Sequence, residues 1–245
     1  MDVYAEKPLR TALLRCAWSR RVSGASASPM RIVPDACVDV MWHRESGRLF
    51  VAGPDTRAHV AASSPGEIVG VRFRTGCSPA ALGVPADALR DERVGLAELW
   101  PGRTERLAED LAATPSTEAA QAVLGSAVLA GVRAGPDPAV PALLTLARGG
   151  TRVGAMADAI GLTERQLHRR CLAAFGYGAK ALQRVLRFDR AIRLALDGAR
   201  LADVAYRAGY ADQAHLSREV RALAGLSPSE YLGDRAVAQD AEVTR

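Results

Sequence analysis

An internal repeat in the last hundred residues constrains the fold more than any other feature of this sequence. The first copy is VGAMADAIGLTERQLHRRCLAAFG (153–176), and the second is LADVAYRAGYADQAHLSREVRALAG (201–225). Each copy holds two stretches of helical periodicity separated by a glycine, and each ends on a second glycine. The repeat therefore predicts two related pairs of helices, with one spacing used twice.

The spacing inside each copy is that of a helix-turn-helix, in which two helices meet at a steep angle through a short turn. Ala157 in the first copy and Ala205 in the second are small enough to let the helices approach closely. Gly161 and Gly209 follow four residues later and can adopt the left-handed conformation that ends a helix. We expect the two units to cover 153–175 and 201–224.

Polar residues at the turns predict where the second helix of each unit begins. Thr163 is placed to cap the helix of the first copy, and Gln166, three residues later, completes a capping box. In the second copy the helix begins at Ala211 or Asp212. These second helices are the candidate recognition helices.

The side chains left outside the apolar stripes of these two helices can hydrogen-bond to base edges. Arginine donates to guanine and glutamine pairs with adenine in the major groove. The outward-facing residues are Arg165, His168 and Arg169 in the first copy and Gln213, His215, Ser217 and Arg218 in the second. Solvated residues of ordinary helical hairpins would give the same pattern in one copy, but two tandem copies favour a nucleic-acid-binding surface.

The segment between the two copies, 179–198, predicts one long helix that ends at Gly198. About 18 helical residues span roughly 27 Å, which is near the ~34 Å between successive major-groove faces of a duplex. The charge of the chain agrees, since residues 141–235 hold 15 Arg or Lys against 9 Asp or Glu, a net +6, and the remainder holds 17 against 18. Candidates for phosphate contacts on or near this helix are Arg184, Arg187, Arg190 and Arg193, and an ordinary solvated face would explain each of them equally well.

The C-terminal part resembles the AraC/XylS-type DNA-binding domain, which has two helix-turn-helix units joined by a long helix. The resemblance covers about 95 residues and is most specific over LADVAYRAGYADQAHLSREVRALAGLSPSEYL (201–232). The chain departs from the family pattern at Ala179, where the second copy has a proline, and at Cys171 and Val220, where an aromatic residue is usual. Carried over, the base-reading positions are Arg165, Arg169, Gln213, Ala214, His215 and Arg218.

The N-terminal part is expected to be β-rich, followed by helices. Short runs rich in Val and Ile (31–43, 48–53 and 67–76) alternate with turn signals, and apolar residues recur at helical spacing from Ser78 to about residue 134. This part resembles, more weakly, a β-rich sensory domain that precedes such DNA-binding domains. The fold class is therefore two-domain α+β, with a cupin-like β-barrel and helices first and an all-α domain second.

The segment RAGPDPAVP (133–141) breaks both helix and strand and is the expected linker. We expect an N-terminal sensory or dimerisation domain over 1–135, a double helix-turn-helix domain over 140–235, and a tail over 236–245. No run of eighteen apolar residues occurs and the N-terminus carries no signal-peptide pattern, so a cytoplasmic location is expected.

Together these features predict a sequence-specific transcription regulator, not an enzyme, with no cofactor and no metal. Its expected partners are double-stranded DNA, a small-molecule effector and RNA polymerase, and the chain is expected to act as a homodimer. Three alternatives stay open: a thiol-based redox sensor that uses Cys37 and Cys77, a DNA alkyl-transfer protein with a reactive cysteine, and an N-terminal domain that only dimerises. A metal site at Cys37, His43, His59 and Cys77 matches no known ligand spacing.

Overall fold

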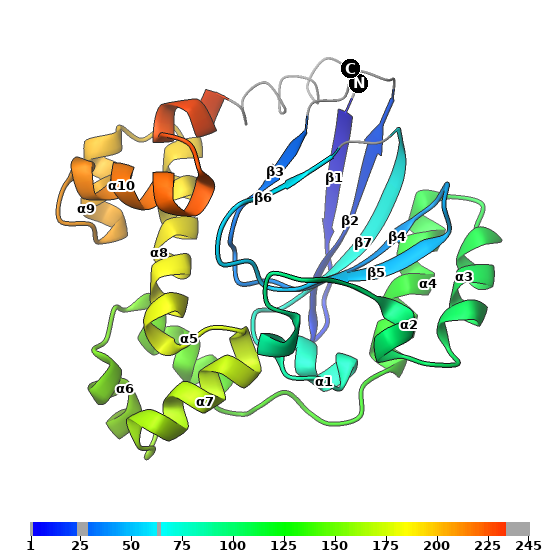
Figure 1. Ribbon diagram of the computed structural model, residues 1–245, viewed down its shortest axis with the longest axis horizontal. Helices are drawn as coiled ribbons and strands as arrows, with labels where there is room; N and C mark the ends of the chain where they lie inside the picture. The colour runs from blue at the N-terminus through cyan, green and yellow to red at the C-terminus, as the bar shows by residue number, and fades with distance from the viewer. Residues whose placement is uncertain (1, 24–28, 63–64, 234–245) are drawn as a thin grey trace.

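The computed structural model of the 245-residue chain describes residues 2–23, 29–62 and 65–233. The β-rich half comes first and the helical half second (Figure 1), as the sequence predicts. The expected tail over 236–245 lies outside the described residues.

A six-stranded antiparallel sheet forms the centre of the N-terminal half. In spatial order its strands are β1 (Asp2–Pro8), β2 (Leu14–Val22), β7 (Gly66–Phe73), β4 (Asp39–His43), β5 (Arg48–Ala52) and β8 (Arg93–Gly95). A separate two-stranded ribbon is formed by β3 (Met30–Ile32) and β6 (His59–Ala61).

The sheet is open, so the predicted barrel is corrected to an open sheet, although the β-rich character is confirmed. β1 and β8 are edge strands that each pair with one neighbour, and the strands that would link them, β3 and β6, pair only with each other. The barrel expectation rested on the number of short strands, and strand number does not determine whether a sheet closes.

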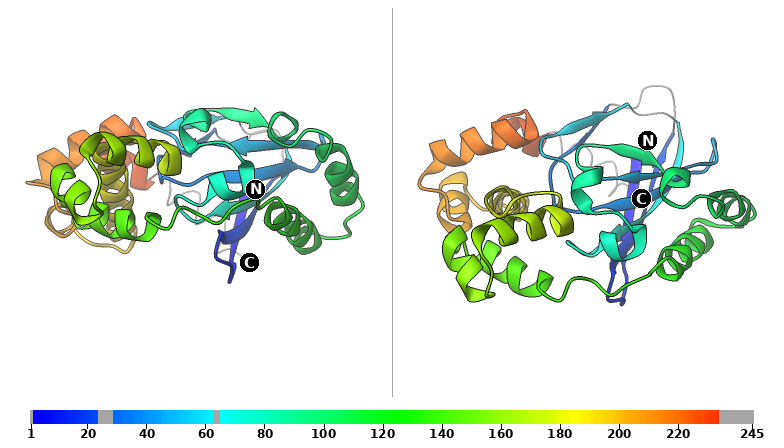
Figure 2. Two further views of the ribbon diagram at one scale, coloured as in Figure 1. Left: turned by 90° about the horizontal axis from the view of Figure 1, so that it is seen from below. Right: turned by 60° about the horizontal axis from the view of Figure 1, so that its bottom comes forward.

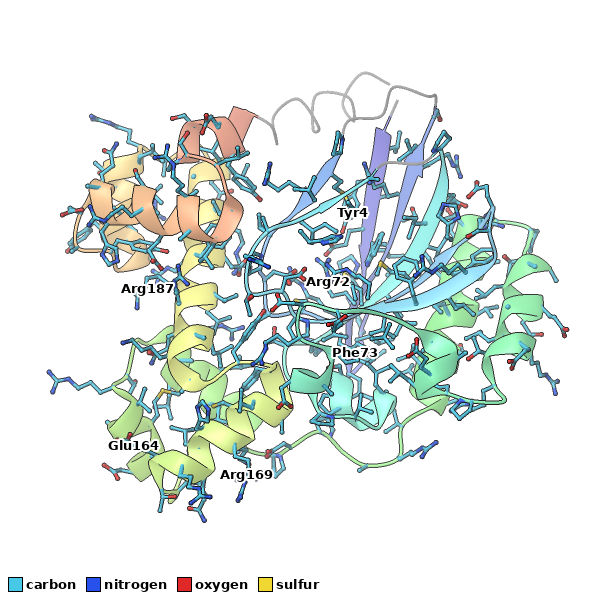
Figure 3. The ribbon with its side chains drawn as sticks, viewed as in Figure 1. Tyr4, Arg72, Phe73, Glu164, Arg169 and Arg187 are labelled. Carbon is cyan, nitrogen blue, oxygen red and sulfur yellow. The ribbon has the colours of Figure 1, made fainter. Side chains whose placement is uncertain are left out.

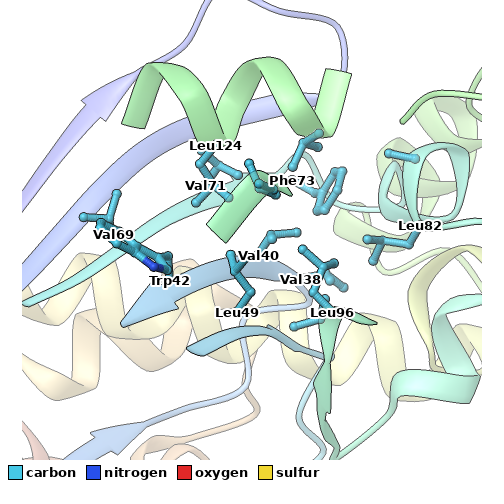
Figure 4. Packing of buried hydrophobic residues seen from close by; sticks show 14 of the residues in the cluster. Val38, Val40, Trp42, Leu49, Val69, Val71, Phe73, Leu82, Leu96 and Leu124 are labelled. Carbon is cyan, nitrogen blue, oxygen red and sulfur yellow. The ribbon is translucent and has the colours of Figure 1, made fainter. Parts of the chain in front are cut away.

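Helices cover one face of the sheet. They are α1 (Ser78–Leu82), the 3-10 helix η1 (Ala86–Leu89), α2 (Leu96–Leu99), α3 (Thr104–Ala112) and α4 (Thr117–Ala130). Alternate residues of β7, such as Val69 and Val71, point toward this layer, and Leu124 of α4 lies over them (Figure 4). Burial of these apolar side chains is the main stabilising contribution to this half.

Four strands escape prediction from the sequence, namely β1, β2, β6 and β8. β6 has only three residues, HVA, which is too few to show an alternation. β1 carries exposed polar residues at an edge, and β2, LRCAWSRRV, carries three arginines, so neither shows a clean apolar alternation. β8 has only three residues and lies inside a stretch, 86–100, whose leucine spacing predicts helix.

The C-terminal half is helical over the described residues. Its helices are α5 (Val140–Arg148), α6 (Val153–Ala159), α7 (Glu164–Phe175), α8 (Ala179–Leu196), α9 (Leu201–Ala208) and α10 (Gln213–Ala224), and residues 228–233 are helical as well. They lie beside the sheet on the side away from α3 and α4, as two further views show (Figure 2). Residues 131–139, which join the halves, carry neither helix nor strand.

The long helix α8 belongs to two separate hydrophobic cores. Its first half places Leu182 and Val185 in a core with α5, α6 and α7. Its second half places Phe188 and Ile192 in a core with α9 and α10. One helix therefore supports both helix-turn-helix units, as the sequence predicts.

Candidate nucleic-acid interface

The first helix-turn-helix unit consists of α6 and α7, with the turn where the sequence places it. Gly161 has a left-handed φ of 68°, which a β-carbon would disfavour. The Thr163 side chain accepts a hydrogen bond from the backbone N–H of Gln166 (3.3 Å), and the side-chain oxygen Oε1 of Gln166 accepts one from the backbone N–H of Thr163 (2.9 Å). The predicted capping box is confirmed, and it sets the direction in which α7 begins.

The second unit consists of α9 and α10 and repeats this design with different chemistry. Gly209 has a φ of 84°, and the carboxylate of Asp212 accepts a hydrogen bond from the N–H of His215 at 2.6 Å. Of the two predicted starting residues, Asp212 is therefore the cap. A charged cap at a helix N-terminus also interacts favourably with the helix dipole.

Buried residues at matching positions fix which face of each candidate recognition helix points outward. Leu167 and Cys171 of α7 are fully buried, and Leu216 and Val220 of α10 occupy the corresponding positions. These inward stripes seat the helices against their partners. The opposite faces, which carry the predicted reading residues, are left exposed.

Three arginines are the candidate base-reading residues whose side chains are exposed and form no hydrogen bond or ion pair with the described residues. Arg165 and Arg169 lie one turn apart on the exposed face of α7, and Arg218 lies on the exposed face of α10. Figure 3 shows Arg169 on the outer side of α7. No hydrogen bond or ion pair from the described part of the chain holds any of the three, so their guanidinium groups are available to a ligand. Gln213 and Ala214 are also exposed, at the start of α10.

The two predicted histidines lie differently from the arginines. His168 is exposed, but its ring lies against Gly178, where an added β-carbon would be 2.7 Å from the ring. His215 is half-buried, packs edge-on against Tyr210 with ring centroids 5.2 Å apart, and accepts a 3.4 Å hydrogen bond from the N–H of Ala211. Both histidines thus support the local fold, and the structure leaves their contact with bases untested.

Most basic residues expected to contact phosphate from α8 are engaged within the protein. Arg184 pairs with Glu219 of α10 at 2.6 Å, and Arg193 pairs with Asp189 one turn away. Arg187 lies over the ring of Tyr210, 5.5 Å from its centroid. Only Arg190 of the four is exposed and lacks a partner among the described residues.

A groove beside α10 adds residues that the sequence reasoning did not single out. It has a volume of about 550 Å³ and lies between the reading face of α10 and the start of the segment 227–229. Arg221, three residues after Arg218 and therefore on the same face, lines it together with Ser217 and Ser229. The i, i+3 spacing between Arg218 and Arg221 indicates from the sequence that the two arginines share one face of the helix.

The cysteines lie in surroundings that disfavour the thiolate. All four are buried and none forms a disulfide. Burial raises the pKa of Cys16 to about 12 and that of Cys171 to about 11, and it raises the pKa of Cys37 well above the ordinary value. Burial also raises the pKa of Cys77, although Arg74 opposes the shift. The reactive thiolate needed for a redox sensor or alkyl acceptor is thus destabilised.

Neither a metal-ligand cluster nor a membrane-spanning helix occurs in residues 2–23, 29–62 and 65–233. No three His, Cys, Asp or Glu side chains there converge as metal ligands would. No helix in those ranges combines the length and apolar character needed to span a membrane.

Two protein families match different halves of the chain. A family described as a helix-turn-helix domain matches residues 156–234, and one described as a domain of unknown function (DUF6597) matches residues 5–95. No curated protein matches the sequence. The first match confirms the helix-turn-helix domain, and the second shows that residues 5–95 are similar to a domain of unknown function.

Solved structures give weaker likenesses. An apo variant of ToxT from Vibrio cholerae strain SCE256 is 12% identical, with 93% of this chain and 99% of that chain covered and a TM-score of 0.49. Fatty-acid-bound ToxT from the same strain is 10% identical (95% and 94% covered, TM-score 0.46), and the transcriptional regulator CdpR from Pseudomonas aeruginosa is 20% identical (69% and 46% covered, TM-score 0.30). At TM-scores below 0.5, these likenesses carry no conclusion about this chain.

Proposed function

Because residues 156–234 are a helix-turn-helix domain with the AraC/XylS-type signature, we propose that this protein is a sequence-specific transcription regulator. It reads two successive major-groove segments of DNA, one with α7 and one with α10. The observation that carries the proposal is the pair of capped recognition helices on one long helix. Each of them presents exposed arginines that have no partner among the described residues.

The length of α8 supports reading by both helices at once. Its 18 residues span about 27 Å, and the two units pack on opposite halves of it. Successive major-groove faces on one side of B-form DNA lie about 34 Å apart. Two recognition helices on such a support can therefore enter neighbouring turns of the groove.

The chemistry of the exposed side chains supports direct base recognition. Arg169 and Arg218 can donate two hydrogen bonds to the O6 and N7 atoms of guanine, and Gln213 can pair with adenine. Ala214 can contact a thymine methyl group. Arg221 and the serines beside it line a groove suited to a phosphate, which positions the duplex without reading its sequence.

The proposal is tested by selecting bound sequences from a random DNA pool with the full chain, followed by gel-shift titrations. Arg169→Ala and Arg218→Ala should each weaken binding to the selected site by about 1–3 kcal/mol and relax the preference at different bases. The matched control is Arg106→Ala, which removes an exposed arginine from α3. Unchanged affinity and base preference in both recognition-helix variants would overturn the assignment.

We further propose that a small-molecule effector acts on the N-terminal half. Support comes from the sheet face opposite α4, which combines aromatic and charged groups as ligand sites do. There the Trp18 indole donates to Asp39 at 2.9 Å, Arg72 pairs with the same carboxylate at 3.0 Å, and Tyr4 stacks on Trp18. A ligand that binds only the folded state should raise the melting temperature, and a compound screen by thermal shift tests this.

We also infer that the protein is not an enzyme, a thiol-based redox sensor or an alkyl-transfer protein. The helix-turn-helix family favours a regulator over an enzyme, and the raised thiol pKa values favour it over redox or alkyl-transfer chemistry. The same proposal includes a cytoplasmic location, a homodimer, contact with RNA polymerase, and a division into domains at 1–135 and 140–235.

A further inference from the structure

Two loops of the N-terminal half each touch both helix-turn-helix units within a few residues. We call them the bridging loops, residues 33–36 between β3 and β4 and residues 53–58 between β5 and β6. In the first loop, Val33 packs against the core of the second unit and Ala36 belongs to the core of the first. A single short segment therefore spans both cores.

The second bridging loop makes directional contacts with both units. At its start, Pro54 lies against Gly176, and the backbone oxygen of Asp55 accepts a hydrogen bond from the hydroxyl of Tyr177. Three residues later, the N–H of Ala58 donates to the backbone oxygen of Leu223 at 2.7 Å. The loop thus contacts the ends of both recognition helices, α7 and α10.

Arginines of the N-terminal half make equivalent contacts at the two helix ends. Arg90 donates to the backbone oxygen of Gly176 at 3.3 Å, and Arg31 donates to that of Ala224 at 3.0 Å. Gly176 and Gly225, which follows Ala224, occupy matching positions in the repeat, and each ends its recognition helix in a left-handed conformation. Each helix C-terminus, where backbone carbonyls lack helical partners, is therefore held by a cation.

The second bridging loop is itself held firmly in the N-terminal half. Arg93 binds the carboxylate of Asp55 through two hydrogen bonds of 2.7 and 3.0 Å, and the carboxylate of Asp91 accepts from the backbone N–H of Thr56 at 2.7 Å. The N–H of Gly53 donates to the backbone oxygen of Glu92 at 3.1 Å. A displacement of one helix-turn-helix unit against the other must therefore break contacts with an anchored segment.

The long helix by itself leaves part of the geometry free. The first core takes its α8 residues from the part up to Leu186, and the second takes its own from Phe188 onward. If α8 were the only connection between the two helix-turn-helix units, a gentle bend in it would change their relative orientation. The bridging loops form a second connection between the two units beside α8. With two connections, a bend or twist of α8 would also have to break the contacts of the loops.

We propose that the bridging loops, with Arg31 and Arg90, set the relative placement of α7 and α10. They thereby determine which spacing between two half-sites the protein accepts in DNA. The statement about spacing rests on the proposed DNA-binding function, whereas the statement about placement does not. The N-terminal half is in this view a specificity determinant that touches no base.

Placement is tested without DNA by measuring a distance between spin labels on the two units. Asp158→Cys on α6 and Ala202→Cys on α9 provide exposed labelling sites away from the reading faces, and the native cysteines are buried. The distance distribution should have one narrow peak in this background. It should broaden or shift when Arg31→Ala, Tyr177→Phe and Arg90→Ala are combined, and Arg106→Ala should leave it unchanged.

An unchanged distribution in a folded triple variant would overturn the proposal. If the triple variant does not fold, Tyr177→Phe and Arg31→Ala are measured singly, since the first removes one hydroxyl and the second one guanidinium. Each should broaden the distribution to a smaller degree. Unaltered widths in both single variants would equally overturn the proposal.

Spacing is tested on the site that the protein selects from random DNA. One base pair inserted between the half-sites rotates the second by about 34° and should cost the unmodified protein about tenfold in affinity. The triple variant should lose less than about threefold. Equal losses would refute the role in spacing, and failure to select any DNA would refute the proposed function while the spin-label result still stands.

Discussion

Substitution of Gly176 by alanine probes the contact between the two halves of the molecule. Gly176 ends α7 with a left-handed φ of 76°, and a β-carbon there would overlap the ring of Pro54 and lie 3.2 Å from the backbone oxygen of Ala86. Gly161, in the turn of the same unit, has a φ of 68° and open space within 4 Å of the β-carbon position. The two glycines share the backbone conformation and differ in whether the N-terminal half lies against them.

The difference in unfolding free energy between the Gly176→Ala and Gly161→Ala variants measures the contact between the two halves. A side chain in the left-handed region costs about 1–2 kcal/mol, and Gly161→Ala should cost no more than this. Gly176→Ala adds overpacking against Pro54, for which forced contacts typically cost about 1–3 kcal/mol. We therefore expect about 2–5 kcal/mol for Gly176→Ala, with the excess located at the contact between the halves.

Two optical probes separate the halves in a urea titration. All three tryptophans, Trp18, Trp42 and Trp100, precede the C-terminal half, so their fluorescence reports the N-terminal half. Far-UV circular dichroism reports mainly the helices, most of which are C-terminal. The transitions should coincide in the unmodified protein and in Gly161→Ala, and should separate in Gly176→Ala as the halves lose their coupling. Equal destabilisation by the two substitutions, with coincident transitions in both, would refute the packing described here.

Two further predictions concern the individual halves. Burial raises the pKa of Glu67, but hydrogen bonds from Thr117, Arg44 and Arg21 outweigh it and lower the pKa overall, so the stability gained is present above the unfolded-state pKa and lost as the pH falls through the folded-state pKa. Glu67→Gln should therefore flatten the acid side of the stability profile measured by tryptophan fluorescence, and an unchanged acid slope would contradict this. Leu216→Ala empties a fully buried position in the core of the second unit and should cost about 2–5 kcal/mol by circular dichroism, whereas a cost below about 1 kcal/mol would show that the core is not packed as described.

The helix-turn-helix units were predictable because their signals are local. The left-handed glycines, the Thr163 cap with Gln166 and the period of the apolar residues all act within about twenty residues of sequence. The same period defines the outward faces of α7 and α10, so the sequence alone predicts that Arg165, Arg169 and Arg218 are exposed. His215 was less predictable, because its packing on Tyr210 depends on the fold of the turn.

What the sequence alone determined is thus the repeat, its caps, the connecting helix and the basic reading faces, since each depends on residues close together in the chain. The tertiary structure alone decided that the sheet stays open, that β1 and β8 form its edges, and that Arg184 is engaged in an ion pair with Glu219 of another helix. It also decided that two loops of the N-terminal half lie against both helix-turn-helix units. The contacts of these loops join residues more than a hundred positions apart, as Ala58 and Leu223 are, and no local pattern encodes such a contact because its free energy arises only when the distant partner is in place.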